Sequence, residues 1–450
     1  MTPRPVGTAA AIAAAVRAGD FTAREAVERA LRRIDETDAG VNAYREVRIF
    51  AALREADEID ARPDRRDLAL AGVPIAIKDN VPVAGEAMRI GSAATADTPQ
   101  PADHEVVRRL RSAGAVVVGL TRTPELCVFG TTDVPGLPTR NPWNPRRSPG
   151  GSSGGAAAAV AAATVPVAHG NDGMGSIRIP AACCGLVALK PGTGVVPSEL
   201  GEGSWFGMAE NGPLATTVED TALVFAAMAG RAMPSLEPPG PLRIALSTRA
   251  PVPLTPVATA WAGAARDTAA ALATAGHRVR PAELPYGQTL GVAQLVRWTA
   301  GTELDARTLP NRDRLQVRTA RHAAAGRLAL RLGFPRERGR AAWRRRAEGF
   351  FADHDVLLTP ALAQSPPLSR SWSERGWLAN LWSNARYAPF AAPWNLAGWP
   401  AMTVPAGLGP EGTPLAVQLV ARPGGEDVLL ALAAQLEQLR PWRRTVDDVG

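Results

Sequence analysis

The sequence predicts an α/β protein, a single α/β/α sandwich around a mixed, largely parallel sheet. Helical patterns alternate with short, continuous apolar runs along the 450 residues, as is typical of strands covered on both faces. The composition, 46% hydrophobic and 21% charged, is that of a globular chain. Apolar runs of about 18 residues, which a transmembrane helix requires, do not occur, so no membrane partner is expected.

The elements follow from periodicity and from the residues that end each run. Helices are expected over residues 8–34 (interrupted at Gly19–Asp20, with a Thr22/Glu25 capping box), 104–113, 155–163, 217–229, 258–275 and 426–439. Buried strands are expected over residues 71–77 and 115–120, and further strands over 242–247, 278–280, 355–358, 401–404 and 415–420. Loops are expected over 139–153 and 169–176. We expect one domain over residues 1–450, in which 240–350 form a variable, mostly helical, insertion-like region.

Charge and cysteine content limit the partners and the compartment. Residues 307–346 carry 13 arginines against Asp313 and Glu337. A solvated helix face explains this block best, and an acidic partner stays an alternative. Because no aromatic-interleaved or helix-turn-helix pattern accompanies it, no nucleic acid is expected; a homodimer is left open. Three cysteines cannot staple a chain of this length, so a reducing, cytoplasmic location is expected.

Lysine is nearly absent from this arginine-rich chain. Of 50 basic residues, only Lys78 and Lys190 are lysine. Arginine can replace lysine wherever a charge is enough, but a guanidinium cannot release its proton at a useful pH. Lys78 stands at the end of a predicted buried strand, where desolvation lowers the pKa of an amine. Bringing that pKa from about 10.4 to about 7 costs roughly 4.6 kcal/mol. Lys78 is therefore predicted to be a general base, and Lys190 a structural residue.

Two glycine-rich loops, residues 148–155 and 170–178, present serines beside a flexible backbone. A serine becomes a nucleophile only when a base takes its proton. The five histidines stand in unlike contexts, His104 and His322 on polar helix faces, and surface or capping roles are expected for them. Because no metal-ligand spacing occurs, neither a metal nor a cofactor is expected.

The segments 72–80, 150–155, 172–181, 184–185, 189–191, 212–215, 395–398 and 414–419 together resemble the amidase signature family. These are serine hydrolases with a Ser–cis-Ser–Lys triad. The resemblance implies Ser176 as the nucleophile, Ser152 as the bridging serine after a cis peptide, and Lys78 as the base. It implies hydrolysis of a carboxamide to a carboxylate plus ammonia or an amine through an acyl-Ser176 intermediate.

The same resemblance implies that backbone amides from Gly173, Met174 and Gly175 to Ser176 form an oxyanion hole. Ser153, Asp172 and Arg178 are implied as neighbours that order the loop of residues 170–178, which carries Ser176 and which we call the nucleophile loop. The sequence departs from the family pattern at Met174, at Asn171 in place of threonine, and at Ala156 in place of serine. These departures bear on substrate preference, and the side chain of Met174 is a candidate to enter the acyl pocket.

The resemblance implies a small-molecule amide as the substrate, and residues 372–399 predict the nature of its acyl group. In that stretch stand Trp372, Trp377, Trp382, Tyr387, Phe390, Trp394 and Trp399. In the family this zone borders the substrate, which favours an apolar or aryl acyl group.

Three alternatives stay open. One is the glutaminase subunit of a tRNA-dependent amidotransferase. Another is an α/β-hydrolase elbow at Gly150-x-Ser152-x-Gly154, which lacks the strand that should precede it. The last is a non-catalytic protein on the same scaffold.

Overall fold

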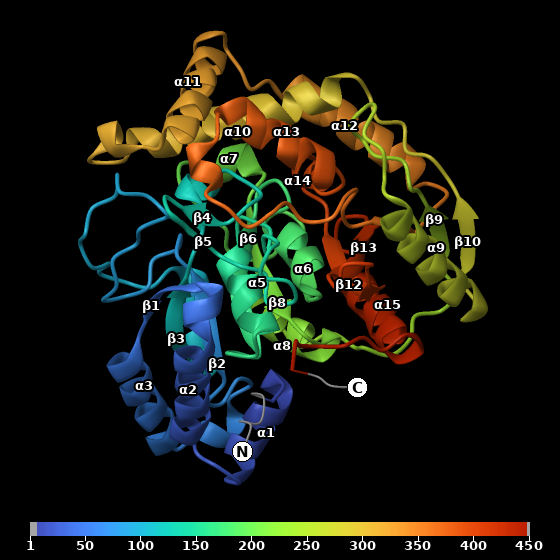
Figure 1. Cartoon of the computed structure of the whole chain (residues 1–450). Helices are drawn as coiled ribbons and strands as arrows, with labels where there is room; N and C mark the ends of the chain where they lie inside the picture. Colours follow the sequence, from blue (N-terminus) through green and yellow to red (C-terminus); the bar gives the residue numbers. More distant parts are fainter. Residues whose placement is uncertain (1–6, 448–450) are drawn as a thin grey trace.

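Eleven strands form the central sheet of the computed structural model, which describes residues 7–447 (Figure 1). In spatial order they are β1 (Tyr44–Val47), β3 (Val116–Thr121), β2 (Pro74–Lys78), β6 (Val167–Asp172), β8 (Glu210–Ala215), β7 (Val187–Lys190), β12 (Ala401–Leu408), β13 (Pro414–Ala421), β11 (Val356–Pro360), β9 (Arg243–Leu246) and β10 (Arg278–Pro281). A separate hairpin joins β4 (Asp133–Val134) to β5 (Leu137–Pro138). The α/β sandwich with a mixed sheet that the sequence predicts is confirmed.

The sheet is less parallel than the sequence predicts. Parallel pairs occur in two groups, β3–β2–β6 and β11–β9–β10. The pairings from β6 across to β11 are antiparallel, and so is β1 with β3. A continuous apolar run shows that both faces of a strand are covered, but an antiparallel strand between two helix layers has the same pattern. Burial therefore does not reveal strand direction.

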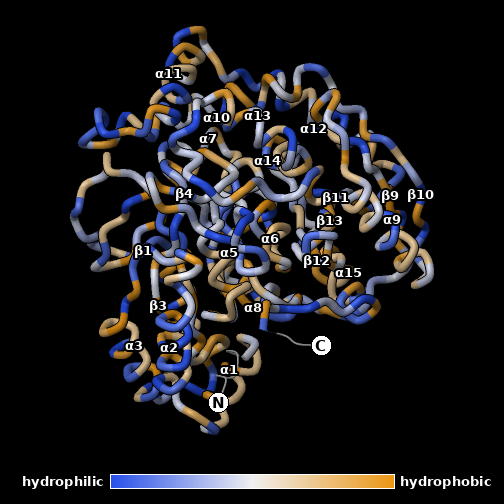
Figure 2. Tube along the Cα trace, viewed as in Figure 1, coloured by the Kyte–Doolittle hydropathy of each residue, from blue (hydrophilic) through white to orange (hydrophobic). Residues whose placement is uncertain are grey.

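Helices cover the sheet and extend above it. They are α1 (Ala9–Ala18), α2 (Ala23–Val41), α3 (Ile49–Ala61), α4 (Glu105–Ser112), α5 (Gly154–Ala161), α6 (Arg178–Cys184), α7 (Ser204–Gly207), α8 (Val218–Ala229), α9 (Thr259–Thr274), α10 (Thr289–Arg307), α11 (Val317–Arg331), α12 (Glu337–Phe350), α13 (Trp377–Tyr387), α14 (Ala392–Ala397) and α15 (Glu426–Leu439). Short 3-10 turns lie at Arg65–Asp67, Glu125–Cys127, Arg312–Arg314 and Trp372–Glu374. Outer helices such as α2 and α3 alternate hydrophilic and hydrophobic residues along the trace, as expected for helices with one buried face (Figure 2).

The helix ends follow the chemistry that the sequence predicts. Gly19 ends α1 in a left-handed conformation, with φ of 85°. Thr22 and Glu25 form the predicted capping box at the start of α2. Within residues 7–447, no helix combines the length and the apolar character needed to cross a membrane.

Helix α5 is buried along its whole length and packs on α6 and β6. Its small residues permit this, since a Cβ added at Gly155 would lie 2.6 Å from backbone atoms of Ala43 and Arg122. Helices α10 to α14 form the layer at the top of Figure 1 and contribute Trp298, Trp343 and Trp394 to a second apolar cluster.

The predicted loop over residues 169–176 is partly wrong. Residues up to Asp172 belong to β6, and only the segment after it leaves the sheet. His169, Gly170, Asn171 and Asp172 pair with β8 although they are polar or small. All four residues are buried. This end of β6 is therefore a buried strand of polar and small residues, which an apolar pattern in the sequence does not reveal.

Candidate active site

Lys78 ends β2, between the parallel strands β3 and β6, and its side chain is fully buried. Its Nζ lies 2.7 Å from Ser152 Oγ and 2.7 Å from Asn171 Oδ1, both within hydrogen-bond distance. Burial lowers the pKa of Lys78, and the charge of Asp172 opposes that shift. When Lys78 is neutral, its nitrogen has a lone pair with which it can accept a hydrogen bond from the Ser152 hydroxyl, and this is the direction that a base requires.

The loop before α5 places Ser152. The Gly151–Ser152 peptide is cis, as the family resemblance implies. Thr132 Oγ1 donates to Gly150 O at 2.9 Å and accepts from the amide of Gly154 at 3.1 Å. A Cβ at Gly154 would lie 2.3 Å from Thr132 Oγ1, so this contact requires glycine.

Ser153 joins the two glycine-rich loops. Its amide donates to Ser176 O at 3.1 Å, and its hydroxyl donates to Asn171 O at 3.2 Å. Because Asn171 also holds Lys78, this pair of contacts ties the segments that carry Lys78, Ser152 and Ser176 into one unit.

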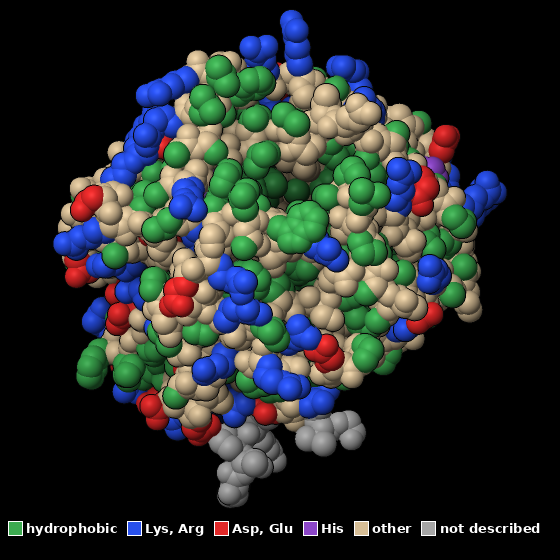
Figure 3. Space-filling model, turned by 45° about the horizontal axis from the view of Figure 1, so that its top comes forward, with side chains coloured by type: hydrophobic (Ala, Val, Ile, Leu, Met, Phe, Trp, Pro, Cys, Tyr) green, Lys and Arg blue, Asp and Glu red, His purple; other side chains and the backbone are tan. Residues whose placement is uncertain are grey.

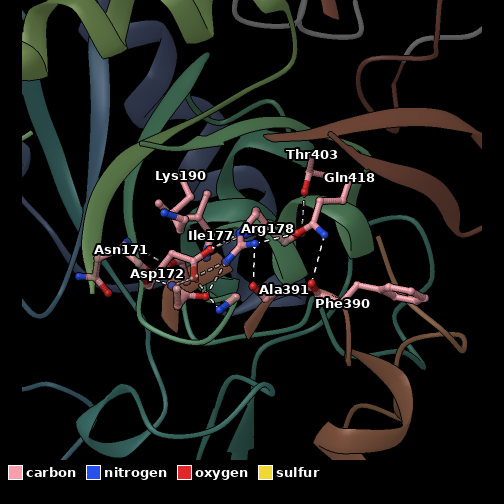
Figure 4. Close-up of polar contacts among 12 residues, drawn as sticks. Asn171, Asp172, Ile177, Arg178, Lys190, Phe390, Ala391, Thr403 and Gln418 are labelled. Carbon is pink, nitrogen blue, oxygen red and sulfur yellow. Dashed lines mark hydrogen bonds and ion pairs between the residues drawn. The ribbon is translucent and has the colours of Figure 1, made fainter. Parts of the chain in front are cut away.

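Asp172 and Arg178 form a buried ion pair beneath the nucleophile loop (Figure 4), with Arg178 Nε 2.8 Å from Asp172 Oδ2. Burial alone would raise the pKa of Asp172, but Arg178 and the Asn395 amide hold it well below its usual range. Arg178 also donates to the carbonyl of Ala391 at 2.9 Å and to Gln418 Oε1 at 2.7 Å. The pair thus fastens the loop to the C-terminal part of the sheet.

The Gly175 amide differs from the role that the family resemblance implies. It donates to Asp172 Oδ1 at 2.5 Å, so it is engaged inside the loop. Gly175 itself has φ of 114°, and a Cβ there would lie 2.6 Å from Ala391 Cβ. Within residues 7–447, the amides of Gly173, Met174 and Ser176 have no such acceptor. These three amides are therefore the candidates for the oxyanion hole that the resemblance implies.

Ser176 is 8% exposed and borders two cavities. The first, which we call the relay cavity, has a volume of about 150 Å³. Its lining includes Asn80, Cys127, Ser152, Asn171, Gly173, Ser176, Trp205 and Asp305. The second, the apolar cavity, has a volume of about 310 Å³. Its lining includes Val128, Phe129, Gly151, Met174, Ser176, Ile179, Gln294, Leu295, Trp298, Leu381, Asn384 and Ala385. Figure 3 shows a hollow surrounded by hydrophobic side chains on the face formed by the top layer of helices.

The aromatic residues of the 372–399 stretch do not line the apolar cavity. Trp394 and Trp399 fill the second apolar cluster, and Trp382 is 66% exposed. The stretch does border the cavity, but through Leu381, Asn384 and Ala385. The aromatic walls are Phe129 and Trp298, which lie far away in the sequence.

Two further expectations about charged and titratable residues change. His322 is not on a polar face but fully buried, 4.4 Å from the Trp298 ring centroid, and burial lowers its pKa to about 3. Within the arginine-rich block, Arg318 is buried against Asp133, and Arg340 donates to the carbonyl of Leu396. Part of the block is therefore structural, since these guanidinium groups satisfy buried acceptors.

Several polar partners of the site were not predicted. The sequence marks Asn171 only as a residue that replaces the family's threonine. In the structure its Oδ1 accepts from Lys78 Nζ, and its Nδ2 donates to Asn80 Oδ1 at 2.6 Å. Asn395 and Gln418 lie in segments that match the family, and both bind Arg178. Gln418 offers a signal, because it is a polar residue inside the otherwise apolar strand β13.

Lys190 is fully buried, and its Nζ donates to the carbonyl of Pro191. Burial lowers its pKa, while the charges of Glu210 and Asp172 oppose the shift. It does not line either cavity beside Ser176. Within residues 7–447, no cluster of three or more His, Cys, Asp and Glu side chains could hold a metal.

Comparisons with known proteins agree with this site. The Amidase family model matches residues 25–430. The AmiB2 protein of Mycobacterium tuberculosis, named as an amidase, is 42% identical over 96% of both chains. A 6-aminohexanoate cyclic dimer hydrolase solved with its substrate has a TM-score of 0.85 and 30% identity, over 98% of this chain and 99% of that one. The peptide amidase of Stenotrophomonas maltophilia has a TM-score of 0.78 and 28% identity, with 98% and 99% coverage. The chain therefore belongs to the amidase signature family, and it is an amidase.

Proposed function

We propose that this amidase cleaves carboxamides through an acyl-Ser176 intermediate, using Ser152 and a neutral Lys78 as a proton relay. The observation that carries the proposal is the buried 2.7 Å contact between Lys78 Nζ and Ser152 Oγ, since Ser152 lines a cavity that Ser176 also lines. Lys78 takes the proton of Ser152 as Ser152 takes that of Ser176, whose oxygen attacks the carbonyl carbon.

The reverse transfer protonates the leaving nitrogen, and the C–N bond breaks. Water then attacks the acyl-enzyme with the same relay as base, releasing the carboxylate and restoring Ser176. Amides of Gly173, Met174 and Ser176 stabilise the oxyanion in both steps, each donor contributing roughly 10²–10³ in rate.

The positions of the two cavities assign the two halves of the substrate. Ser152 returns the proton to the leaving nitrogen, and Ser152 lines the relay cavity, so the leaving group occupies that side. A cavity of about 150 Å³ accommodates a group the size of benzene. The acyl group occupies the apolar cavity, which is about twice as large and includes Met174 in its wall.

Two other functions receive less support. For the glutaminase alternative, no charged side chain lines the apolar cavity to pair with the α-ammonium and α-carboxylate groups of a γ-glutamyl group. The relatives described above are named as an amidase, a 6-aminohexanoate cyclic dimer hydrolase and a peptide amidase. An α/β-hydrolase elbow at Ser152 would need a strand directly before it, whereas residues 148–150 are irregular and Gly151 is a bend.

Treatment with a fluorophosphonate is expected to label Ser176, the residue that attacks. Peptide mapping by mass spectrometry identifies the modified serine. Ser176→Ala should abolish both labelling and amide hydrolysis, whereas Ser235→Ala, at an exposed serine, should change neither. A label on Ser152 with Ser176 unmodified would instead favour the elbow, and a protein that neither reacts nor hydrolyses would be a non-catalytic one.

Lengthening the acyl chain of primary alkanamides is expected to raise kcat/KM about three- to fourfold per methylene until the apolar cavity is full, because each buried methylene contributes about 0.8 kcal/mol. Ala385→Phe, which fills part of that cavity, should move the optimum to shorter chains. Ala379→Phe, on the same helix but outside the cavity, is the control. A rate independent of chain length, or glutamine as the best substrate, would contradict the assignment.

A further inference from the structure

We propose that Gln294 and Trp298 form a hydrogen-bond donor site in the apolar cavity, and that this site recognises a neutral acceptor atom on the acyl group. The proposal rests on the proposed function for the assignment of this cavity to the acyl group. It adds a polar requirement to a substrate half that would otherwise be selected by size and hydrophobicity alone.

The two side chains share one wall of the cavity. Both belong to α10 and stand four residues apart, which places them on the same face of the helix one turn apart. Gln294 is 9% exposed and Trp298 is 7% exposed. Across residues 7–447, no hydrogen-bond acceptor contacts either Gln294 Nε2 or Trp298 Nε1.

Two neighbouring buried N–H groups without acceptors are unusual, since most buried polar groups in native proteins are hydrogen-bonded. Ligand pockets, in contrast, combine apolar walls with a few polar groups that become paired when the ligand binds. The surrounding wall is largely apolar and includes Phe129, Leu295 and Leu381. An acceptor on the ligand would therefore satisfy donors that the protein itself leaves without partners.

The chemistry of the wall selects the kind of acceptor. The indole N–H of Trp298 can only donate, and a half-turn of the Gln294 carboxamide exchanges its oxygen and its NH₂ group. No charged side chain lines this cavity, so a carboxylate there would be buried without a counter-charge. The atom that binds there must accept hydrogen bonds and must carry no charge. The carbonyl oxygen of a ketone, an ester or an amide meets both conditions.

The test compares octanamide with isomeric oxo-octanamides, which carry one ketone at successive positions of the chain. We define selectivity as kcat/KM for the best oxo isomer divided by kcat/KM for octanamide. Gln294→Leu and Trp298→Phe are each expected to lower selectivity about tenfold, because each removes one donor to the ketone oxygen. Gln438→Leu, at an exposed glutamine of α15, should leave selectivity unchanged.

Selectivity within twofold of the wild-type value in both variants would overturn the proposal. A fall in only one variant would assign recognition to that residue alone and overturn the two-donor site. Trp298→Phe keeps most of the aromatic ring, so it decides the question if Gln294→Leu does not fold.

Binding to the Ser176→Ala protein separates this proposal from the proposed function. Dissociation constants of octanamide and the oxo isomers are measured by calorimetry, with and without Gln294→Leu. Selective binding that Gln294→Leu removes, in a chain whose wild type hydrolyses no amide, would support the donor site and overturn the hydrolytic function. Hydrolysis with no preference for any oxo isomer, in rate or in binding, would support the hydrolytic function and overturn the donor site.

Discussion

Replacing Lys78 by arginine is expected to abolish amide hydrolysis as completely as replacing it by alanine, with kcat falling by about 10³-fold or more in both variants. Arginine keeps the positive charge and the long stem, but its guanidinium does not lose a proton at any pH at which the protein is folded. The amine must be neutral to accept the proton of Ser152, 2.7 Å away. Steady-state rates of the purified variants measure the effect.

The pH dependence of kcat/KM in the wild type tests whether Lys78 acts as the base. Burial lowers the pKa of Lys78, so the neutral, active form becomes dominant at a lower pH than for an exposed lysine. kcat/KM should therefore rise with pH through that lowered pKa and then level off. Lys190→Arg is the matched control and should reduce stability without moving this profile. An active Lys78→Arg protein would remove Lys78 as the base.

Replacing Arg178 by methionine is expected to lower the free energy of unfolding by about 3–5 kcal/mol, because it leaves the Asp172 carboxylate buried without its counter-charge. The nucleophile loop should lose order as well, since Asp172 accepts from the Gly175 amide. Urea denaturation followed by circular dichroism measures the stability.

The sign of the pH effect follows from the pKa of Asp172. In the wild type that pKa is held below its usual range, so the pair stabilises the fold above about pH 4 and the stabilisation is lost as the pH falls through the lowered value. The difference between wild type and Arg178→Met should narrow as the pH is lowered from 7. Arg243→Met, which breaks a surface pair with Asp355, should cost at most about 1 kcal/mol. An equal loss from both substitutions would show that the buried pair has no special role.

Local chemistry made several elements predictable. The capping box of Thr22 and Glu25 depends on residues three apart, and Lys78 follows directly from the apolar run that forms β2. The rarity of lysine in the sequence also points to Lys78, because an amine and a guanidinium differ in the one property that a base needs.

Features that depend on distant segments were not predictable. Residues 169–172 appeared to be a loop because His169, Asn171 and Asp172 meet their polar partners only in the folded chain. Those partners are Asn211, Lys78 and Arg178. The apolar cavity brings Phe129 together with Trp298 and Leu381, which are separated by many residues. The sequence suggested the tryptophans after residue 371 as walls of the substrate cavity. Composition alone cannot distinguish an aromatic residue in the core from one that lines a cavity.

The proposed relay and the cavity proposed for the acyl group come from different parts of the chain. Lys78, Ser152 and Ser176 are supplied by residues before 180, at the ends of β2 and β6 and in the loops beside α5. Much of the apolar cavity comes from α10 and α13, after residue 288. Substitutions confined to the later region can therefore change which acyl groups fit, without altering the local contacts of the proposed relay residues.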